Sequence, residues 1–116
     1  MPRDAYFTVQ QIYRGWALFG IVLLGALAAN LGLAVALRHK PDAASPALIG
    51  AIFLAATLAV FFTWTYPANQ LTNNWTFVPA NWAALRRQWE YSHAVNAVLT
   101  FLALCAVALA ALKARE

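Results

Sequence analysis

The chain has 116 residues, of which 63% are hydrophobic and only 10% are charged. Roughly a quarter of the residues in soluble globular domains are charged, so this composition argues against that class, and the few scattered charges argue against a disordered or nucleic-acid-binding chain. The charged residues, whose net charge is +4, lie beside apolar runs, where lipid headgroups would be their natural neighbours. A single cysteine excludes an intrachain disulfide and a cysteine-based zinc site.

Three segments contain no charged residue: 15–37, 45–66 and 94–112. A helix needs about 20 apolar residues to cross a ~30 Å hydrocarbon core, and backbone groups in lipid must be bonded within the segment. The sequence therefore predicts an all-α integral membrane bundle with three transmembrane helices, in one domain of residues 1–116. The first segment also has features of a signal peptide, but its apolar run continues unbroken to Leu37, which favours a retained span.

The distribution of aromatic residues predicts that the two ends of the bundle differ. Three spans place the N-terminus and the segment 67–93 on one side, and the loop 38–44 and the C-terminus on the other. Arginine and lysine are divided equally, so the positive-inside rule does not set the orientation. All five Trp and all four Tyr, in contrast, belong to the first side or its interface. This cluster predicts an interfacial cap, a pocket or a partner surface; the alternative is an ordinary aromatic belt.

Prolines mark the breaks between the predicted helices. Pro41 and Pro46 forbid helix continuation and explain the stop and restart between the first two spans. Pro67 either ends or kinks the second helix. Asn81 has the position of an N-cap, and no breaker follows it. The third helix is therefore predicted from Trp82 to about Lys113, which is longer than a bilayer needs.

One face of the third predicted helix carries a stripe of residues at alternating spacings of four and three. Its members are Trp82, Arg86, Trp89, His93, Asn96, Thr100, Ala103, Val107 and Ala110. The stripe changes from aromatic and basic to polar, and then to small and apolar. Polar residues inside a span tend to face the bundle, and small residues permit close helix contact. We therefore expect His93, Asn96 and Thr100 to point inward, toward the mouth of the bundle.

The first span carries a second pattern, a seam of small residues. The seam consists of Gly25, Ala29, Gly32 and Ala36. Small residues at such spacing favour close helix packing in lipid, so we predict that the seam faces another helix. Asn30 lies off this seam and is expected to bond to a neighbour as a structural residue.

Candidate chemistry concentrates around the start of the third span. Glu90 and His93 have the E-x-x-H spacing of di-iron bundles, but a metal site needs several anionic ligands and no other acid lies within a span. We therefore expect no metal, and we expect Glu90 to pair with Arg86 or Arg87. The sequence has no serine triad and no glycine-rich phosphate loop. No cofactor is predicted.

His93 is the ionisable residue best suited to proton transfer near neutral pH at an inner position. It could exchange a proton with a lipophilic substrate. The alternative is a structural interfacial histidine that bonds to Gln10, Tyr13 or Asn69. The sequence leaves both interpretations open.

Several motifs resemble a single family. They are Tyr6–Trp16, Tyr66–Asn69, Asn74–Thr76 and Leu85–His93. Together they resemble the DUF1772 group of small bacterial membrane proteins, which is grouped with the anthrone oxygenase-like proteins. The most specific parts are the Pro-x-Asn after the second span and the Arg-x-x-Trp-x-x-x-His at the third, which correspond here to Arg86, Trp89 and His93.

The resemblance implies a four-helix bundle in the bacterial inner membrane. Fungal relatives suggest oxygenation of a phenolic tricyclic anthrone without an evident cofactor motif. Because only three spans are visible, we expect that an N-terminal helix, which would precede Tyr6, is missing from this sequence.

Two functional hypotheses follow. In the first, a lipophilic aromatic compound is bound or oxidised at the aromatic side. The mouth would be lined by Tyr13, Arg14, Asn69, Arg86, Trp89, His93 and Asn96. In the oxygenase form, His93 would accept the phenolic proton and Arg86 or Arg87 would stabilise the oxyanion. In the second, the chain is a non-enzymatic accessory or structural subunit, or a transporter component. The expected partners are the lipid bilayer, the aromatic ligand and further copies of the chain, and no nucleic acid.

Overall fold

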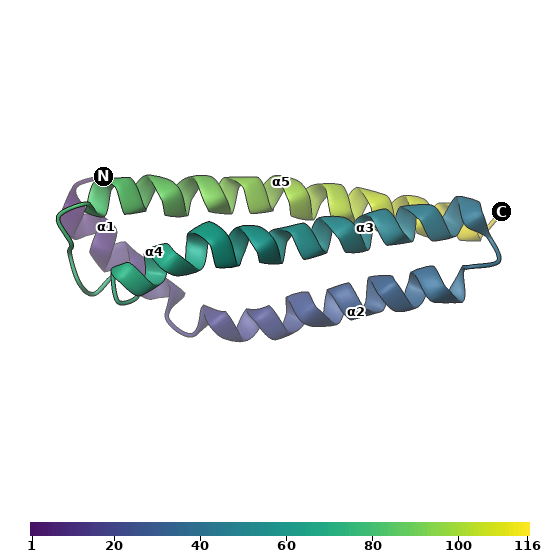
Figure 1. Ribbon diagram of the computed structural model, residues 1–116, viewed down its shortest axis with the longest axis horizontal. Helices are drawn as coiled ribbons and strands as arrows, with labels where there is room; N and C mark the ends of the chain where they lie inside the picture. The colour runs from purple at the N-terminus through teal and green to yellow at the C-terminus, as the bar shows by residue number, and fades with distance from the viewer.

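The computed structural model describes the backbone of residues 1–116 and every side chain except that of Ala17. The described chain is all-helical and has no strand. Its α-helices are α1 (Arg3–Gln10), α2 (Gly20–Ala36), α3 (Pro41–Val60), α4 (Tyr66–Leu71) and α5 (Trp82–Ala114). Figure 1 shows α2, α3 and α5 running side by side along a rod that measures 55 × 20 × 20 Å. The short helices α1 and α4 gather at one end, and the chain's C-terminus lies at the other.

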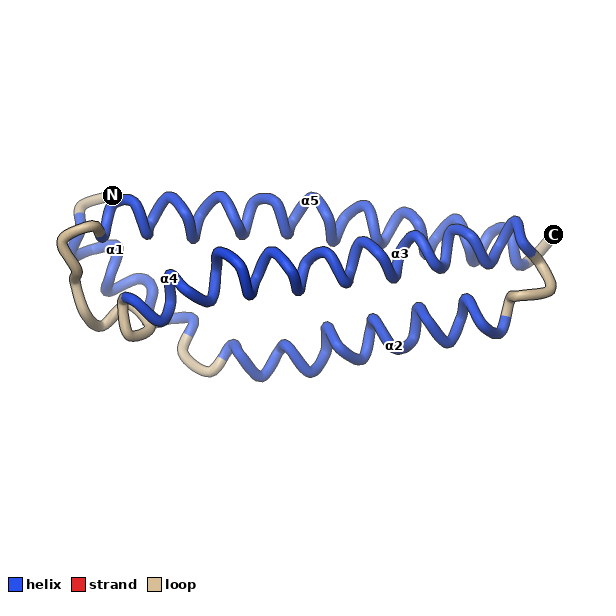
Figure 2. Tube along the Cα trace, in the orientation of Figure 1, coloured by secondary structure: helices blue, strands red, loops and turns tan.

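Two of the helical segments are long and apolar enough to cross a membrane: Pro41–Leu71, with 31 residues, and Trp82–Ala114, with 33. The third apolar helix, α2, has 17 residues. It begins later than the predicted start at residue 15, because Gly15 adopts a positive φ of 84° and a 3₁₀ turn over Trp16–Phe19 follows. The loops lie at the two ends of the rod, as Figure 2 shows.

The second helix begins earlier and ends later than predicted. Pro41 occupies the first turn of α3, where its missing N–H would have no helical partner in any case. Pro46 lies inside the helix and does not interrupt it. At the other end, α3 continues through a π-helical turn, Phe61–Thr65, into α4. Pro67 therefore does not end the helix, because the wider π turn accommodates a residue that cannot donate a backbone hydrogen bond.

Small residues form the main helix contact, between α3 and α5. Ala43, Ala47 and Ala110 are completely buried, and Ala51 and Ala103 nearly so. Gly50 is the point of closest approach to both neighbouring helices. A Cβ atom added there would lie 2.9 Å from Asn30 Oδ1 of α2 and 3.4 Å from the backbone oxygen of Ala103 of α5. Small side chains thus let the three long helices meet closely.

The predicted seam of α2 does not pack within this chain. Gly25, Ala29, Gly32 and Ala36 are all exposed, and a Cβ added at Gly25 or Gly32 would meet no atom within 4 Å. The face directed toward α3 instead carries Asn30, whose amide nitrogen donates to the Ala26 backbone oxygen at 2.9 Å. The prediction was wrong because the space for close packing is provided by Gly50 of α3 and is filled by the Asn30 side chain.

Candidate functional site

A packed aromatic cap covers the end of the bundle that holds the N-terminus. Tyr6 and Phe7 of α1 are buried against Trp75 of the α4–α5 loop, and each ring centroid lies 5.4 Å from that of Trp75 in an edge-to-face arrangement. Ala68 of α4 and Leu85 of α5 complete the buried cluster, with Trp82 and Trp89 packed against it. The one-sided aromatic cluster in the sequence is therefore a built structure, because its central rings pack on one another and not only on lipid.

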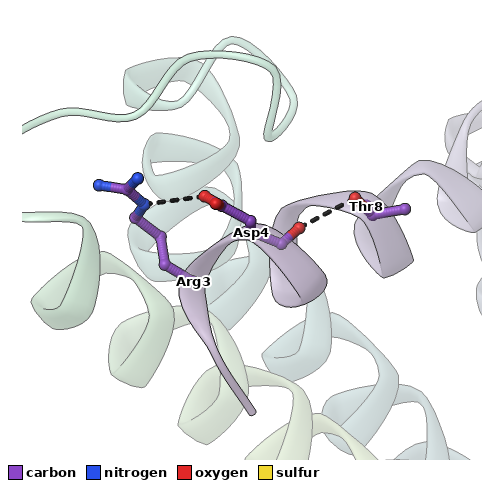
Figure 3. A network of polar contacts seen from close by, with 3 residues as sticks. All are labelled: Arg3, Asp4 and Thr8. Atoms are coloured by element: carbon purple, nitrogen blue, oxygen red, sulfur yellow. Dashed lines mark hydrogen bonds and ion pairs between the residues drawn. The ribbon is translucent and has the colours of Figure 1, made fainter.

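Polar contacts at the start of α1 add little to this packing. Arg3 Nε lies 3.0 Å from Asp4 Oδ1, and the Thr8 hydroxyl donates to the Asp4 backbone oxygen at 2.9 Å (Figure 3). The Arg3 and Asp4 side chains are 51% and 86% exposed. Exposed ion pairs contribute about 0 to 1 kcal/mol. The buried rings of α1, and not these contacts, hold the helix on the bundle.

A strained loop places Trp75 in the cap. Asn73, Asn74 and Trp75 all adopt positive φ angles, of 48°, 56° and 65°. Asn tolerates this conformation, whereas Trp does so only when its surroundings impose it. The buried Thr72 hydroxyl donates to the Ala68 backbone oxygen at 2.8 Å and accepts the Trp75 backbone N–H at 3.1 Å. The indole N–H of Trp75 donates to Asn69 Oδ1 at 2.9 Å, which ties the loop to α4.

The cap continues into the turn that follows α1. Gln11 donates its side-chain amide to the Trp75 backbone oxygen at 2.9 Å. Its amide oxygen accepts a hydrogen bond from Arg14 Nη2 at 3.2 Å. The next ring, Tyr13, contacts Trp16 and Trp89, with centroid distances of 4.7 and 5.6 Å. The turn between α1 and α2 is therefore fixed on both the loop and α5.

An open groove of about 770 Å³ lies between this turn, the Trp75 loop and the ends of α3 and α5. Its aromatic and imidazole lining consists of Tyr13, Trp16, Phe61, Trp75, Trp89 and His93. Its amide and hydroxyl lining consists of Gln10, Gln11, Thr65, Asn69, Asn73, Asn74 and Thr76. Arg14 and Gly15 complete it. The volume lies within the range of small-molecule sites, and the lining combines aromatic rings with many polar groups.

The π-helical turn shapes the floor of the groove. It brings Phe61 and Thr65 to the lining, and the buried Thr65 hydroxyl donates to Ser92 Oγ of α5 at 2.7 Å. Ser92 in turn donates to the Trp89 backbone oxygen at 2.8 Å. Gln88 donates to the Trp64 backbone oxygen at 2.8 Å. These bonds join the π turn to α5 directly below Trp89 and His93. Such turns occur frequently at functional sites.

The structure brings together five of the seven sequence-predicted site residues. Tyr13, Arg14, Asn69, Trp89 and His93 line the groove. The ring centroids of Trp89 and His93 lie 4.1 Å apart. Among the described contacts, His93 has no hydrogen bond to Gln10, Tyr13 or Asn69. Its ring packs on Trp89 and is otherwise accessible from the groove.

Arg86 points away from the groove. Its Nε lies 3.0 Å from Glu90 Oε1, and its Nη1 donates to the Met1 backbone oxygen at 2.9 Å. The guanidinium carbon also lies 4.4 Å from the centroid of the Tyr6 ring, in a cation–π contact. The expected pairing of Glu90 with Arg86 is confirmed. Burial, followed by the neighbouring Glu90 charge, raises the pKa of the Tyr6 phenol to about 12.

Asn96 also lies outside the groove lining. Its amide nitrogen donates to the Thr57 backbone oxygen of α3 at 3.2 Å, so it joins two helices below the groove. Thr100, which we expected to point inward, is exposed.

The buried face of α5 differs from the predicted stripe by one residue at three positions. Trp82, Trp89, Asn96, Ala103 and Ala110 do face α3 or the cap. Between them, Leu85, Ser92 and Leu99 are more buried than the stripe residues that follow them, Arg86, His93 and Thr100, whereas Ala106 and the stripe residue Val107 are both half-buried. Arg86 and His93 flank this face and turn toward α1 and the groove.

Sequence reasoning did not identify Gln10, Gln11, Thr65 or Trp75 as parts of the site. Gln10 and Gln11 follow the buried Tyr6 and Phe7 on α1, and a glutamine pair next to apolar rings is a signal that could have indicated them. Thr65 reaches the groove only because of the π turn. No local pattern predicts this widened turn.

The described residues contain no group of three His, Cys, Asp or Glu side chains that could hold a metal ion. Comparisons of the chain with models of protein families, with characterised proteins and with solved structures find no match.

Proposed function

We propose that the protein is an integral membrane protein that binds a lipophilic aromatic compound in the groove. The membrane location is supported by the outward-facing apolar surface of the two long helices. Only 28% and 11% of their most apolar windows are buried inside the chain. A core helix of a soluble protein would be mostly buried, so these surfaces need another apolar environment.

The proposal includes α2 as a third span. Its 17 residues rise about 26 Å at 1.5 Å per residue. The preceding 3₁₀ turn, Trp16–Phe19, adds about 8 Å at ~2.0 Å per residue. Together they match a hydrocarbon core of ~30 Å. With three spans, the cap and the groove lie at one membrane interface, where Trp and Tyr are favoured.

The observation that carries the binding function is the ring wall of the groove. Tyr13, Trp16, Trp89 and His93 form one continuous series of ring contacts along it. A flat conjugated compound gains both apolar burial and ring contacts on such a wall. The groove lies beside Trp16, which is 54% exposed, so a membrane-dissolved compound can reach it without crossing the aqueous phase.

The resemblance to the DUF1772 and anthrone oxygenase-like proteins supports the same class of ligand. In an oxygenase form of the proposal, His93 takes the proton of a phenolic substrate, because it is the one imidazole on the groove. Arg86 is engaged with Glu90 and Met1 on the opposite flank. Arg14 is therefore the cation placed to face an oxyanion in the groove.

Binding is tested with the two histidines of the chain. The protein in phosphatidylcholine nanodiscs is titrated with 2-naphthol and observed by ligand NMR. We expect His93→Ala to weaken binding about threefold to tenfold, because it removes one ring contact. His39→Ala, at an exposed site on the other end, is the matched control and should leave the Kd unchanged. Equal affinity of all three proteins, or no binding at all, would contradict the proposal.

A second function, that of an accessory subunit, is favoured by one observation. The exposed seam of α2 presents Gly25, Ala29, Gly32 and Ala36 to the surroundings, a pattern that supports close contact with another transmembrane helix. In this alternative, Gly32→Leu changes the oligomeric state or the recovery of a partner, while 2-naphthol does not bind.

A further inference from the structure

We infer that the ligand of the groove is an aromatic acid, held as an anion by Arg14. The inference rests on the proposed binding function and adds the charge of the ligand, the residue that recognises it and the short distance between its ring and its acidic group. Three features of the groove support it: the position of Arg14, the charge balance of the lining and the arrangement of rings and amides.

A built turn positions Arg14. Arg14 has φ −60° and ψ 126°, and Gly15 follows with φ 84°. These angles match the central residues of a type II turn, which requires glycine at the second position. The guanidinium Nη2 bonds to Gln11 Oε1 at 3.2 Å, and Gln11 is itself bound to the Trp75 loop. Arg14 is therefore fixed at the groove by a neutral partner that leaves its charge uncompensated.

The charge balance distinguishes Arg14 from the other cations at this end. Arg3 lies 3.0 Å from Asp4, and Arg86 lies 3.0 Å from Glu90. Arg87 is exposed and is not part of the lining. The residues that line the groove include Arg14 but no aspartate or glutamate. An anionic ligand would restore neutrality there, and a cationic one would face an unpaired positive charge.

The neighbours of Arg14 in the lining indicate where the acid group and the ring lie. Arg14 stands in the chain between Tyr13 and Trp16, whose rings belong to the aromatic wall. The amide of Gln11, which also lines the groove, is the hydrogen-bond partner of Arg14. A ligand whose carboxylate binds Arg14 can therefore place its ring on Tyr13 and Trp16 only if few bonds separate the carboxylate from the ring. Aryl or arylacetic acids have this geometry. An anionic phospholipid has no ring to occupy the wall.

The test compares two probes of nearly equal shape, 1-naphthylacetate and its neutral amide, 1-naphthylacetamide. Both are titrated at pH 7.5 into the protein in phosphatidylcholine nanodiscs. We expect the acid to bind about tenfold more tightly, as a charge-assisted hydrogen bond implies. Arg14→Gln should abolish this preference, because the acid loses its charged partner and then binds no more tightly than the amide does to the same variant. Arg87→Gln removes an equal charge from the same end outside the groove, and it should preserve the preference.

Each other result overturns the inference. If Arg14→Gln and Arg87→Gln reduce acid binding equally, the acid senses only surface charge. If nanodiscs containing phosphatidylglycerol abolish acid binding, the anion site belongs to a lipid headgroup. If the amide binds as tightly as the acid, the inference fails and the proposed function stands. If neither probe binds the unmodified protein, both fail.

Discussion

The two ends of the α3–α5 pair are packed by opposite means. At the end near the C-terminus, small side chains such as Ala47 and Ala110 are completely buried, and the helices approach closely. At the other end, large rings line a groove of about 770 Å³, among them those of Tyr13, Trp75 and Trp89. Small residues maximise helix contact in lipid, whereas large rings pack edge to face and leave space beside them. The comparison teaches that one helix pair can be closely packed at one end and can border an open groove at the other.

The largest effect is expected from removing the ring at the centre of the cap. Trp75→Ala should reduce the free energy of unfolding by about 3 to 5 kcal/mol, because Trp75 is 4% exposed and contacts Tyr6 and Phe7. Near-UV circular dichroism during denaturation with SDS measures the loss. Trp64→Ala is the control, since Trp64 is 49% exposed. Equal losses in the two variants would show that the cap is not a packed core.

The stem is tested by enlarging Gly50. Gly50→Leu should reduce the free energy of unfolding by about 1 to 3 kcal/mol, because the added atoms meet Asn30 Oδ1 and the backbone of Ala103. The same denaturation experiment reports it. The matched control is Gly32→Leu, where an added Cβ has no neighbour within 4 Å, and it should not destabilise the monomer. A comparable loss at Gly32 would mean that the seam of α2 packs as closely as Gly50.

A smaller effect is expected where the stem meets the groove. Ser92→Ala removes the acceptor of the Thr65 hydroxyl, and it should cost about 1 kcal/mol. Thr65→Val removes the donor instead. A double-mutant cycle measures their coupling, and the double variant should lose less than the sum of the single variants. Additive losses would indicate that the two hydroxyls do not interact.

An effect of similar size but opposite sign concerns the phenol within the cap. The Tyr6 hydroxyl oxygen is buried and has no hydrogen-bond partner among the described residues. Tyr6→Phe should therefore raise the free energy of unfolding by about 1 kcal/mol at neutral pH. The variant also tests the pKa of about 12 in the folded state, which is above the ordinary pKa of a tyrosine phenol, about 10.

The folded state favours the neutral form of the Tyr6 phenol. The contribution of this preference to the free energy of unfolding is therefore complete below pH 10 and is lost as the pH rises toward 12. Between pH 9 and pH 11, the unmodified protein should lose more stability than Tyr6→Phe. Unfolding measured at both pH values gives the difference. If the two proteins lose the same amount of stability, the phenol is not shielded from solvent.

The groove shows how far sequence patterns could locate a site. The aromatic residues gathered at one end of the bundle predicted a structure there, and Trp89 and His93 do line the groove. A stripe at alternating spacings of three and four, however, fits two adjacent sets of positions equally well. The set with Ser92 became the buried one, and Arg86 was directed to Glu90 and Met1 instead of the groove.

The sequence by itself determined the apolar helices, the break before Pro41 and the gathering of Trp and Tyr at one end, because hydropathy and proline chemistry act locally. It also located the start of α5 after Asn81, although the Asn81 side chain makes no cap hydrogen bond. Only the tertiary structure decided which faces meet. The positive φ angles of Asn73–Trp75 and the π turn at Phe61–Thr65 exist because distant side chains hold them. Asn favours a positive φ locally, but no local preference favours it at Trp75 or favours the π turn, and both segments contribute residues to the groove.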